Sequence, residues 1–203
     1  MQQVYTDPAP VPADLLQALE ARRAASATRM GGANHGFSHP LYHHVGRIEQ
    51  LVQVTGAKRI LDYGTTDGKE YDARVVELPG EAGKRTVVDF WGVDVVHCYD
   101  PARATFCNVP RSPFDGVVCL NLLEYCAGHH ATRLVQELFS LSTGFVFVAI
   151  GSEAPYPRAA QAWLDVIASA ARAFPKVIWE AWVTEAGPMP QAERRLANFN
   201  WNS

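Results

Sequence analysis

Two short runs of the sequence, residues 114–120 (FDGVVCL) and 144–150 (GFVFVAI), are apolar at almost every position. A strand inside a parallel sheet is covered on both faces, so it needs apolar side chains at consecutive positions. Residues 59–63 and 91–99 form two more such runs, and longer amphipathic stretches alternate with the runs. This alternation predicts βαβ units and therefore an α/β domain whose doubly wound, mostly parallel sheet carries helices on both faces.

Helical spacing of apolar residues predicts the segments that connect the strands. In residues 131–142, Leu134, Leu138 and Leu141 recur as the buried face of a crossover helix requires. The other predicted helices are residues 15–30, 41–55 and 159–174, and a last strand is expected around residues 176–184.

The N-terminal segment is expected to be an arm followed by an amphipathic helix. Three prolines within residues 1–12 keep the arm from joining a helix or a sheet ladder. In the helix, Leu15, Leu16 and Leu19 lie near one face, and Arg22 and Arg23 are expected on the opposite one. We therefore divide the chain into an arm and helix (1–36), an α/β domain (37–185) and a C-terminal tail (186–203).

Composition limits the classes of partner. The chain has 203 residues and a formal net charge of -3, so no global positive field attracts nucleic acid, and none is predicted as a partner. No apolar run is long enough for a membrane span, and the first residues lack the order of a signal peptide. The four cysteines form no C-x-x-C pair, which favours free thiols and a cytoplasmic location.

The first candidate site is the turn that follows the run at 59–63. An apolar strand ends in Asp62, and the chain then turns through Gly64, Thr66 and Gly68. Such a turn brings backbone N–H groups to the carboxyl end of a parallel sheet, where open α/β folds bind ligands. A plain strand-to-helix turn would have the same residues, so both interpretations stay open.

Two further strand ends carry polar residues. Asp100 closes the run at 91–99, where a carboxylate can accept both ribose hydroxyls of a nucleoside. Its alternative role is that of a helix N-cap before Pro101. The run at 114–120 ends at Asn121, which places Glu124 and Tyr125 beside the same crevice.

These three segments, in this order, resemble the class I S-adenosylmethionine-dependent methyltransferases. The likeness is to small phage and bacterial methyltransferase-like proteins whose pattern runs LDYGCGKG, YDPA, then FDGVVCxDVLEH; it covers about residues 37–183. The resemblance implies a Rossmann-like fold and S-adenosylmethionine as cofactor. It implies that Asp62, Gly64 and Gly68 line the methionine and ribose end, with Thr66 in the same loop, that Asp100 holds the ribose hydroxyls and that residues 121–125 form the pocket floor.

The chain departs from the family pattern in both diagnostic loops. The second glycine of the first loop is replaced by Thr66, whose Cβ crowds the cofactor space. The Asp and His of the family's DVLEH are replaced by Asn121 and Tyr125, which removes the family's imidazole. Two hypotheses follow: a methyltransferase for an unknown acceptor in which Glu124 or Tyr125 orients or deprotonates that acceptor, or a catalytically inactive scaffold that has lost the cofactor.

Other functions find less support in the residues. His35, His39, His43 and His44 lie close in sequence, but Pro40 interrupts them and no acidic third ligand is near, so no metal is predicted. Cys126 with His129 and His130 lacks a second cysteine pair. A nicotinamide-dependent reductase would need the G-x-G-x-x-G spacing, which is absent. The proline-rich arm and the tail with Phe199 and Trp201 suit docking onto a protein partner, and the tail equally suits docking onto the chain's own surface.

Overall fold

The structure is a computed structural model of the whole chain. The residues that it describes are 13, 16–17, 19–22, 24, 40–65, 68–72, 85–108, 110, 112–126, 128–151, 159–184 and 193–197. The proline-rich arm, His35, His39, Thr66 and the last six residues lie outside the described residues, and so do the predictions made for them.

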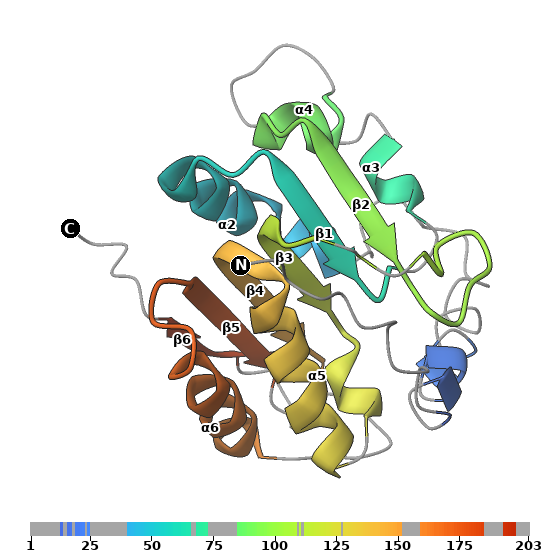
Figure 1. The fold of residues 1–203 in the computed structure, drawn as a ribbon, viewed down its shortest axis with the longest axis vertical. Coiled ribbons are helices and arrows are strands. Elements are labelled where there is room, and N and C mark those ends of the chain that lie inside the picture. Colours follow the sequence, from blue (N-terminus) through green and yellow to red (C-terminus); the bar gives the residue numbers. More distant parts are fainter. Residues whose placement is uncertain are drawn as a thin grey trace, which may run out of the picture.

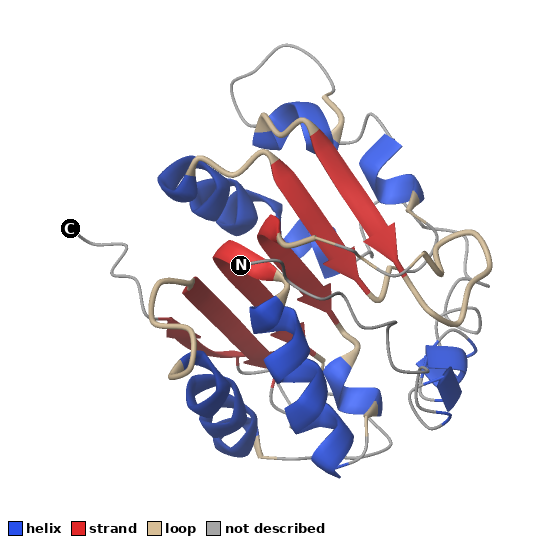
Figure 2. Ribbon diagram, in the orientation of Figure 1, coloured by secondary structure: helices blue, strands red, loops and turns tan. Residues whose placement is uncertain are grey.

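A six-stranded sheet is the centre of the described fold (Figures 1 and 2). Its strands are β1 (Arg59–Tyr63), β2 (Val95–Tyr99), β3 (Phe114–Leu120), β4 (Ser142–Ile150), β5 (Ile178–Thr184) and β6 (Glu193–Ala197). The first five are parallel, and β6 pairs with β5 in the antiparallel direction. The prediction of an α/β fold with a mostly parallel sheet is therefore confirmed at this level.

The strand order, β2-β1-β3-β4-β5-β6, decides where a ligand site can form. The chain goes outward from β1 to β2 on one side and then returns to build β3, β4 and β5 on the other side. The order 2-1-3-4-5 of the parallel strands is one of the two common orders of doubly wound sheets. Its switch point lies between the carboxyl ends of β1 and β3, and a crevice at such a point is where open α/β folds bind ligands.

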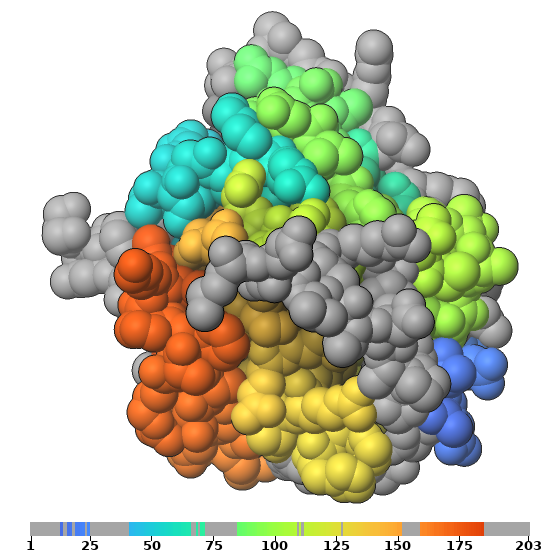
Figure 3. Space-filling model, in the orientation of Figure 1, coloured from blue at the N-terminus to red at the C-terminus, as the bar shows by residue number. Residues whose placement is uncertain are grey.

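Helices pack on both faces of the sheet (Figure 2). They are α2 (Pro40–Thr55), α3 (Lys69–Asp72), α4 (Val87–Trp91), α5 (Gly128–Ser140) and α6 (Ala160–Ala171), with the 3₁₀ turn η1 at Leu123–Tyr125. One apolar core lies between the sheet and α5 with α6, which form the yellow and orange surface in Figure 3; the other lies under α2 and α4. Leu134 and Leu138 are buried in the first core, as their spacing predicted.

The predicted strand at 91–99 begins too early. Residues 87–91 form α4, which Thr86 caps by accepting a hydrogen bond from the Asp89 N–H at 3.0 Å, and Gly92 ends it in the left-handed conformation at φ 65°. Trp91 is thus a helical residue, and its indole N–H donates to the Val45 carbonyl at 2.9 Å. The strand β2 starts only at Val95. Thr86 and Gly92 cap the two ends of this short helix, and the apolar residues between them resemble the start of a strand when only the sequence is considered.

Strand β6 was not predicted, because it falls in the segment assigned to the tail. It extends the sheet by pairing Thr184 with Glu193 and Glu180 with Ala197. Among the described residues, none of the helices has both the length and the apolar character needed to cross a membrane.

Candidate functional site

The turn after β1 forms the centre of the candidate site. The N–H groups of Gly64 and Thr65 both donate to the Tyr99 carbonyl, at 2.7 and 3.3 Å, so the chain leaves the sheet beside the end of β2. Gly64 has φ 83° and Gly68 has φ 69°, a backbone region that side chains disfavour. A Cβ on Gly64 would lie 2.6 Å from Cδ2 of Leu122, which is two residues beyond the end of β3. The turn and the end of β3 therefore meet closely at the switch point.

Asp62 is buried beneath this turn, at 4% exposure. The pKa of its carboxyl group is raised to about 6, first by burial and second by the negative charge of Glu70 in α3, while Thr65, Arg22 and Tyr71 act in the opposite direction. The Thr65 hydroxyl oxygen is itself buried and makes no hydrogen bond that meets ordinary geometric limits. Perturbed carboxyl groups in a crevice are common in functional sites.

Asp100 lies at the end of β2, as predicted, and is 6% exposed. Its Oδ1 accepts a hydrogen bond from the Ala102 N–H at 2.8 Å, and its carbonyl accepts from the Arg103 N–H at 3.0 Å. Residues 101–106 form turns and contain no helix, so the alternative role of a helix N-cap is corrected to that of a turn cap. A single Asp side chain commonly stabilises such a turn through its own backbone.

The end of β3 carries an unusual backbone conformation. Asn121 has φ 49° and is the one non-glycine residue with positive φ among those that the structure describes. Asparagine tolerates this region better than most residues, and strained backbone gathers at functional sites. The Asn121 N–H donates to the Ala149 carbonyl at 2.8 Å, so the bend begins while the chain is still joined to β4.

Glu124 and Tyr125, the residues expected to act on a methyl acceptor, lie in η1 directly after this bend. Glu124 is 2% exposed and Tyr125 is 7% exposed. The Glu124 Oε1 accepts a hydrogen bond from the Gly151 N–H at 2.9 Å. This carboxylate joins the chain after β3 to the end of β4, which is a positioning role.

Arg22 is the site residue that the sequence analysis missed. It was expected on the polar face of its helix, but it is 7% exposed and therefore buried. One guanidinium nitrogen donates to the Gly64 carbonyl, and the other donates to the Leu120 carbonyl at 2.9 Å. The spacing to Leu19, which is 2% exposed, was the available signal, because residues three apart share a helix face.

The histidines and cysteines do not assemble into a metal centre within the described part of the chain, where no group of three potential ligands is found. His43 is exposed, whereas the neighbouring His44 packs on Phe147 and Trp182. The His129 and His130 rings lie 3.7 Å apart, but Cys126 is buried and its thiol contacts the Leu122 carbonyl.

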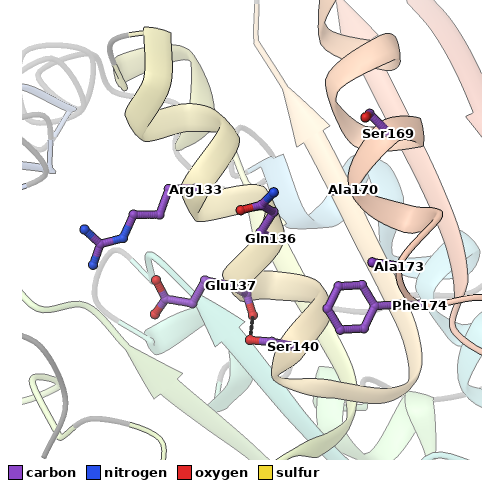
Figure 4. Close-up of a pocket in the computed structure, with 8 residues that line it drawn as sticks. All are labelled: Arg133, Gln136, Glu137, Ser140, Ser169, Ala170, Ala173 and Phe174. Atoms are coloured by element: carbon purple, nitrogen blue, oxygen red, sulfur yellow. Dashed lines mark hydrogen bonds between the residues drawn. The ribbon is translucent and has the colours of Figure 1, made fainter.

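A separate groove of about 530 Å³ lies between α5 and α6. Figure 4 shows Gln136 and Ser140 of α5 on one side and Phe174, which follows α6, on the other. Ser140 comes just before β4, and Phe174 comes just before β5. The groove is thus near the amino ends of the strands, away from the switch point, and contains none of the predicted site residues.

The structure brings together Asp62, Gly64, Gly68, Asp100 and Asn121 at one edge of the sheet, with η1 beside them. No protein-family model matches the chain, and no match is found among curated proteins or solved structures.

Proposed function

We propose that the protein is an S-adenosylmethionine-dependent methyltransferase acting on an acceptor of unknown identity. One observation carries the proposal: β1 lies between β2 and β3 in the parallel sheet, so Asp62, Asp100 and Asn121, which lie at or directly after the carboxyl ends of these strands, are neighbours beside the switch point. This edge is where doubly wound sheets bind nucleotide cofactors. The family resemblance of the same three segments supports the choice of cofactor.

The polar groups at this edge suit an adenosyl ligand. Asp100 has one carboxylate oxygen committed to its own turn, and the carboxylate is suited to accept ribose hydroxyl groups. Asp62 and the Thr65 hydroxyl add buried oxygens under the turn. A bound sulfonium would supply an activated methyl group, so the protein would mainly need to align the acceptor and exclude water. In this proposal Tyr125 has the role of orienting that acceptor.

Side chains limit the room for a cofactor at the switch point. The side chains of Arg22 and Leu122 lie against Gly64, in the space where a side chain on Gly64 would point, and Arg22 also bonds the last residue of β3. This favours a second candidate function, a non-catalytic scaffold built on the same fold. The Glu124 Oε1 accepts a hydrogen bond from the Gly151 N–H and therefore has a structural role, which is consistent with a scaffold.

Calorimetry and thermal unfolding with S-adenosylmethionine distinguish the two functions. A ligand at one hundred times its Kd adds about 2.7 kcal/mol to the free energy of unfolding. For a domain of this size, that corresponds to a rise in melting temperature of about 5–10 °C. We expect such a rise for the full chain and for Asp94→Ala, a control at an exposed residue before β2. For Asp100→Ala we expect no rise in melting temperature with S-adenosylmethionine. No rise at millimolar ligand would favour the scaffold, and unchanged binding by Asp100→Ala would place the site elsewhere.

A further inference from the structure

Arg22 comes from the N-terminal helical residues and reaches the switch point, where the dark blue segment of Figure 1 lies near the carboxyl ends of β1 and β2. Its two hydrogen bonds join carbonyl groups that are 42 and 98 residues away in sequence. One belongs to the turn after β1 and the other to the last residue of β3. A single side chain thus bridges the two strands that define the crevice.

The chemistry of this position is that of a cation site. Two carbonyl oxygens accept from the guanidinium, and the positive charge lowers the pKa of the nearby Asp62 carboxyl group against the larger effect of burial. Burying a guanidinium is costly unless its donors are satisfied. The switch point therefore offers acceptors and negative charge to a positively charged group, and Arg22 is the group that uses them.

The contacts around Arg22 also fill space. The Nη1 atom of Arg22 would lie 3.1 Å from a Cβ on Gly64, on the same side as the Leu122 side chain. Leu19, one helical turn earlier, is buried in the apolar core that contains Leu122 and Leu123. The N-terminal helical residues are thus docked by an apolar contact and by charge-assisted hydrogen bonds at the same place.

We propose that Arg22 is an internal competitor for the switch crevice: its guanidinium takes the position of a ligand's cationic group and must withdraw before that ligand binds. The proposal rests on the proposed function, because S-adenosylmethionine is the cationic ligand considered. An internal competitor lowers the apparent affinity by the fraction of molecules in which the site is open. Weakening the Arg22 contacts raises that fraction and must tighten binding.

The test measures the Kd of S-adenosylmethionine by calorimetry for the full chain and for Arg22→Gln and Arg22→Lys. We expect binding about tenfold tighter in Arg22→Gln, because a neutral amide cannot reproduce two charge-assisted bonds. Arg22→Lys keeps the charge but lacks the forked guanidinium that bonds both carbonyl groups, so we expect a smaller increase in affinity for S-adenosylmethionine than in Arg22→Gln. Arg172→Ala, at an exposed arginine after α6, serves as the matched control with unchanged binding.

Each outcome decides a separate point. Equal or weaker binding by the Arg22 variants overturns the competitor and leaves the methyltransferase standing. No binding by the full chain or by any variant overturns both proposals. Because a buried arginine contributes to folding, hydrogen exchange of the unaltered chain gives a second measurement. Saturating S-adenosylmethionine should increase exchange at residues 19–22, and unchanged or slower exchange there contradicts the withdrawal of Arg22.

Discussion

The Glu124 carboxylate accepts a hydrogen bond from the backbone N–H of Gly151, and this 2.9 Å contact joins the chain after β3 to the end of β4. The two segments are separated along the chain by the whole of α5 and β4. Glu124 therefore fixes the geometry of the crevice edge from below the surface, at 2% exposure.

We expect Glu124→Gln to retain the stability of the fold, because its amide oxygen can still accept from Gly151. Glu124→Ala should cost about 1–3 kcal/mol, since the half-buried N–H of Gly151 loses its partner. Chemical denaturation measures both. If methyl transfer is detected, Glu124→Gln should keep kcat within a few-fold; a loss of about a hundredfold with unchanged Kd would instead identify Glu124 as a general base.

Asp62→Asn should stabilise the protein at neutral pH. The folded carboxyl group has a pKa of about 6 against an ordinary value of 3.8, so the folded state holds a proton that the unfolded state releases between these values. The free energy of unfolding then falls as pH rises from about 4 to 6, by about 3 kcal/mol in total. Asparagine has nearly the same shape as aspartate but carries no ionisable group, so Asp62→Asn removes the cost of ionising a buried carboxyl group.

In urea unfolding, Asp62→Asn should therefore have a higher free energy of unfolding than the unaltered chain above pH 6, and this difference should disappear near pH 4. Asp94→Asn, at an exposed position, provides the control and should show no such gain. A gain in Asp62→Asn of equal size at both pH values would contradict the assigned cause. Under the proposed function the same variant should also weaken binding of S-adenosylmethionine, an exchange of function for stability.

His44 should give the opposite pH dependence. Burial, and to a smaller extent the electrostatic effect of the neighbouring His43, lowers its pKa from 6.5 to about 4. The unfolded state binds the proton first, so stability is lost as pH falls from about 6.5 to 4, by about 3 kcal/mol. His44→Phe keeps the packing on Phe147 and Trp182 and should abolish this loss.

His129→Phe is the control for this experiment, since His129 is exposed on α5 and is not among the groups that lower the pKa of His44. Unfolding by urea at pH 4.5 and pH 7 compares the two variants with the unaltered chain. A pH dependence that persists in His44→Phe would assign the effect to another group.

Gly64→Ala should destabilise the fold by about 1–3 kcal/mol, because its φ of 83° disfavours a side chain and the new Cβ would meet Leu122 at 2.6 Å. Gly46→Ala is the contrasting variant. Gly46 lies in α2 with nothing within 4 Å of a Cβ, and alanine there should add about 0.5–1 kcal/mol. Thermal unfolding compares the two; a neutral Gly64→Ala would contradict the close approach of the two strand ends.

Local pattern was sufficient for much of the fold. The apolar runs at β1, β3 and β4 predicted buried parallel strands, and Gly56, with φ 66°, ends α2 as expected. Pattern failed where a segment's neighbours decide its structure. The sequence of β6, ERRLA, has no strand signal of its own and becomes a strand by pairing with β5 at the edge of the sheet.

The same division holds for the candidate site. The sequence by itself determined that Asp62, Asp100 and Asn121 end apolar strands, because strand ends follow from local hydrophobic pattern. Only the tertiary structure decided that Arg22 bonds the carbonyl groups of Gly64 and Leu120 and that Glu124 bonds the Gly151 N–H. Those contacts join residues from separate elements. The spacing to Leu19 indicates that Arg22 shares a buried helix face, but the partners of Arg22 depend on how helices and strands pack.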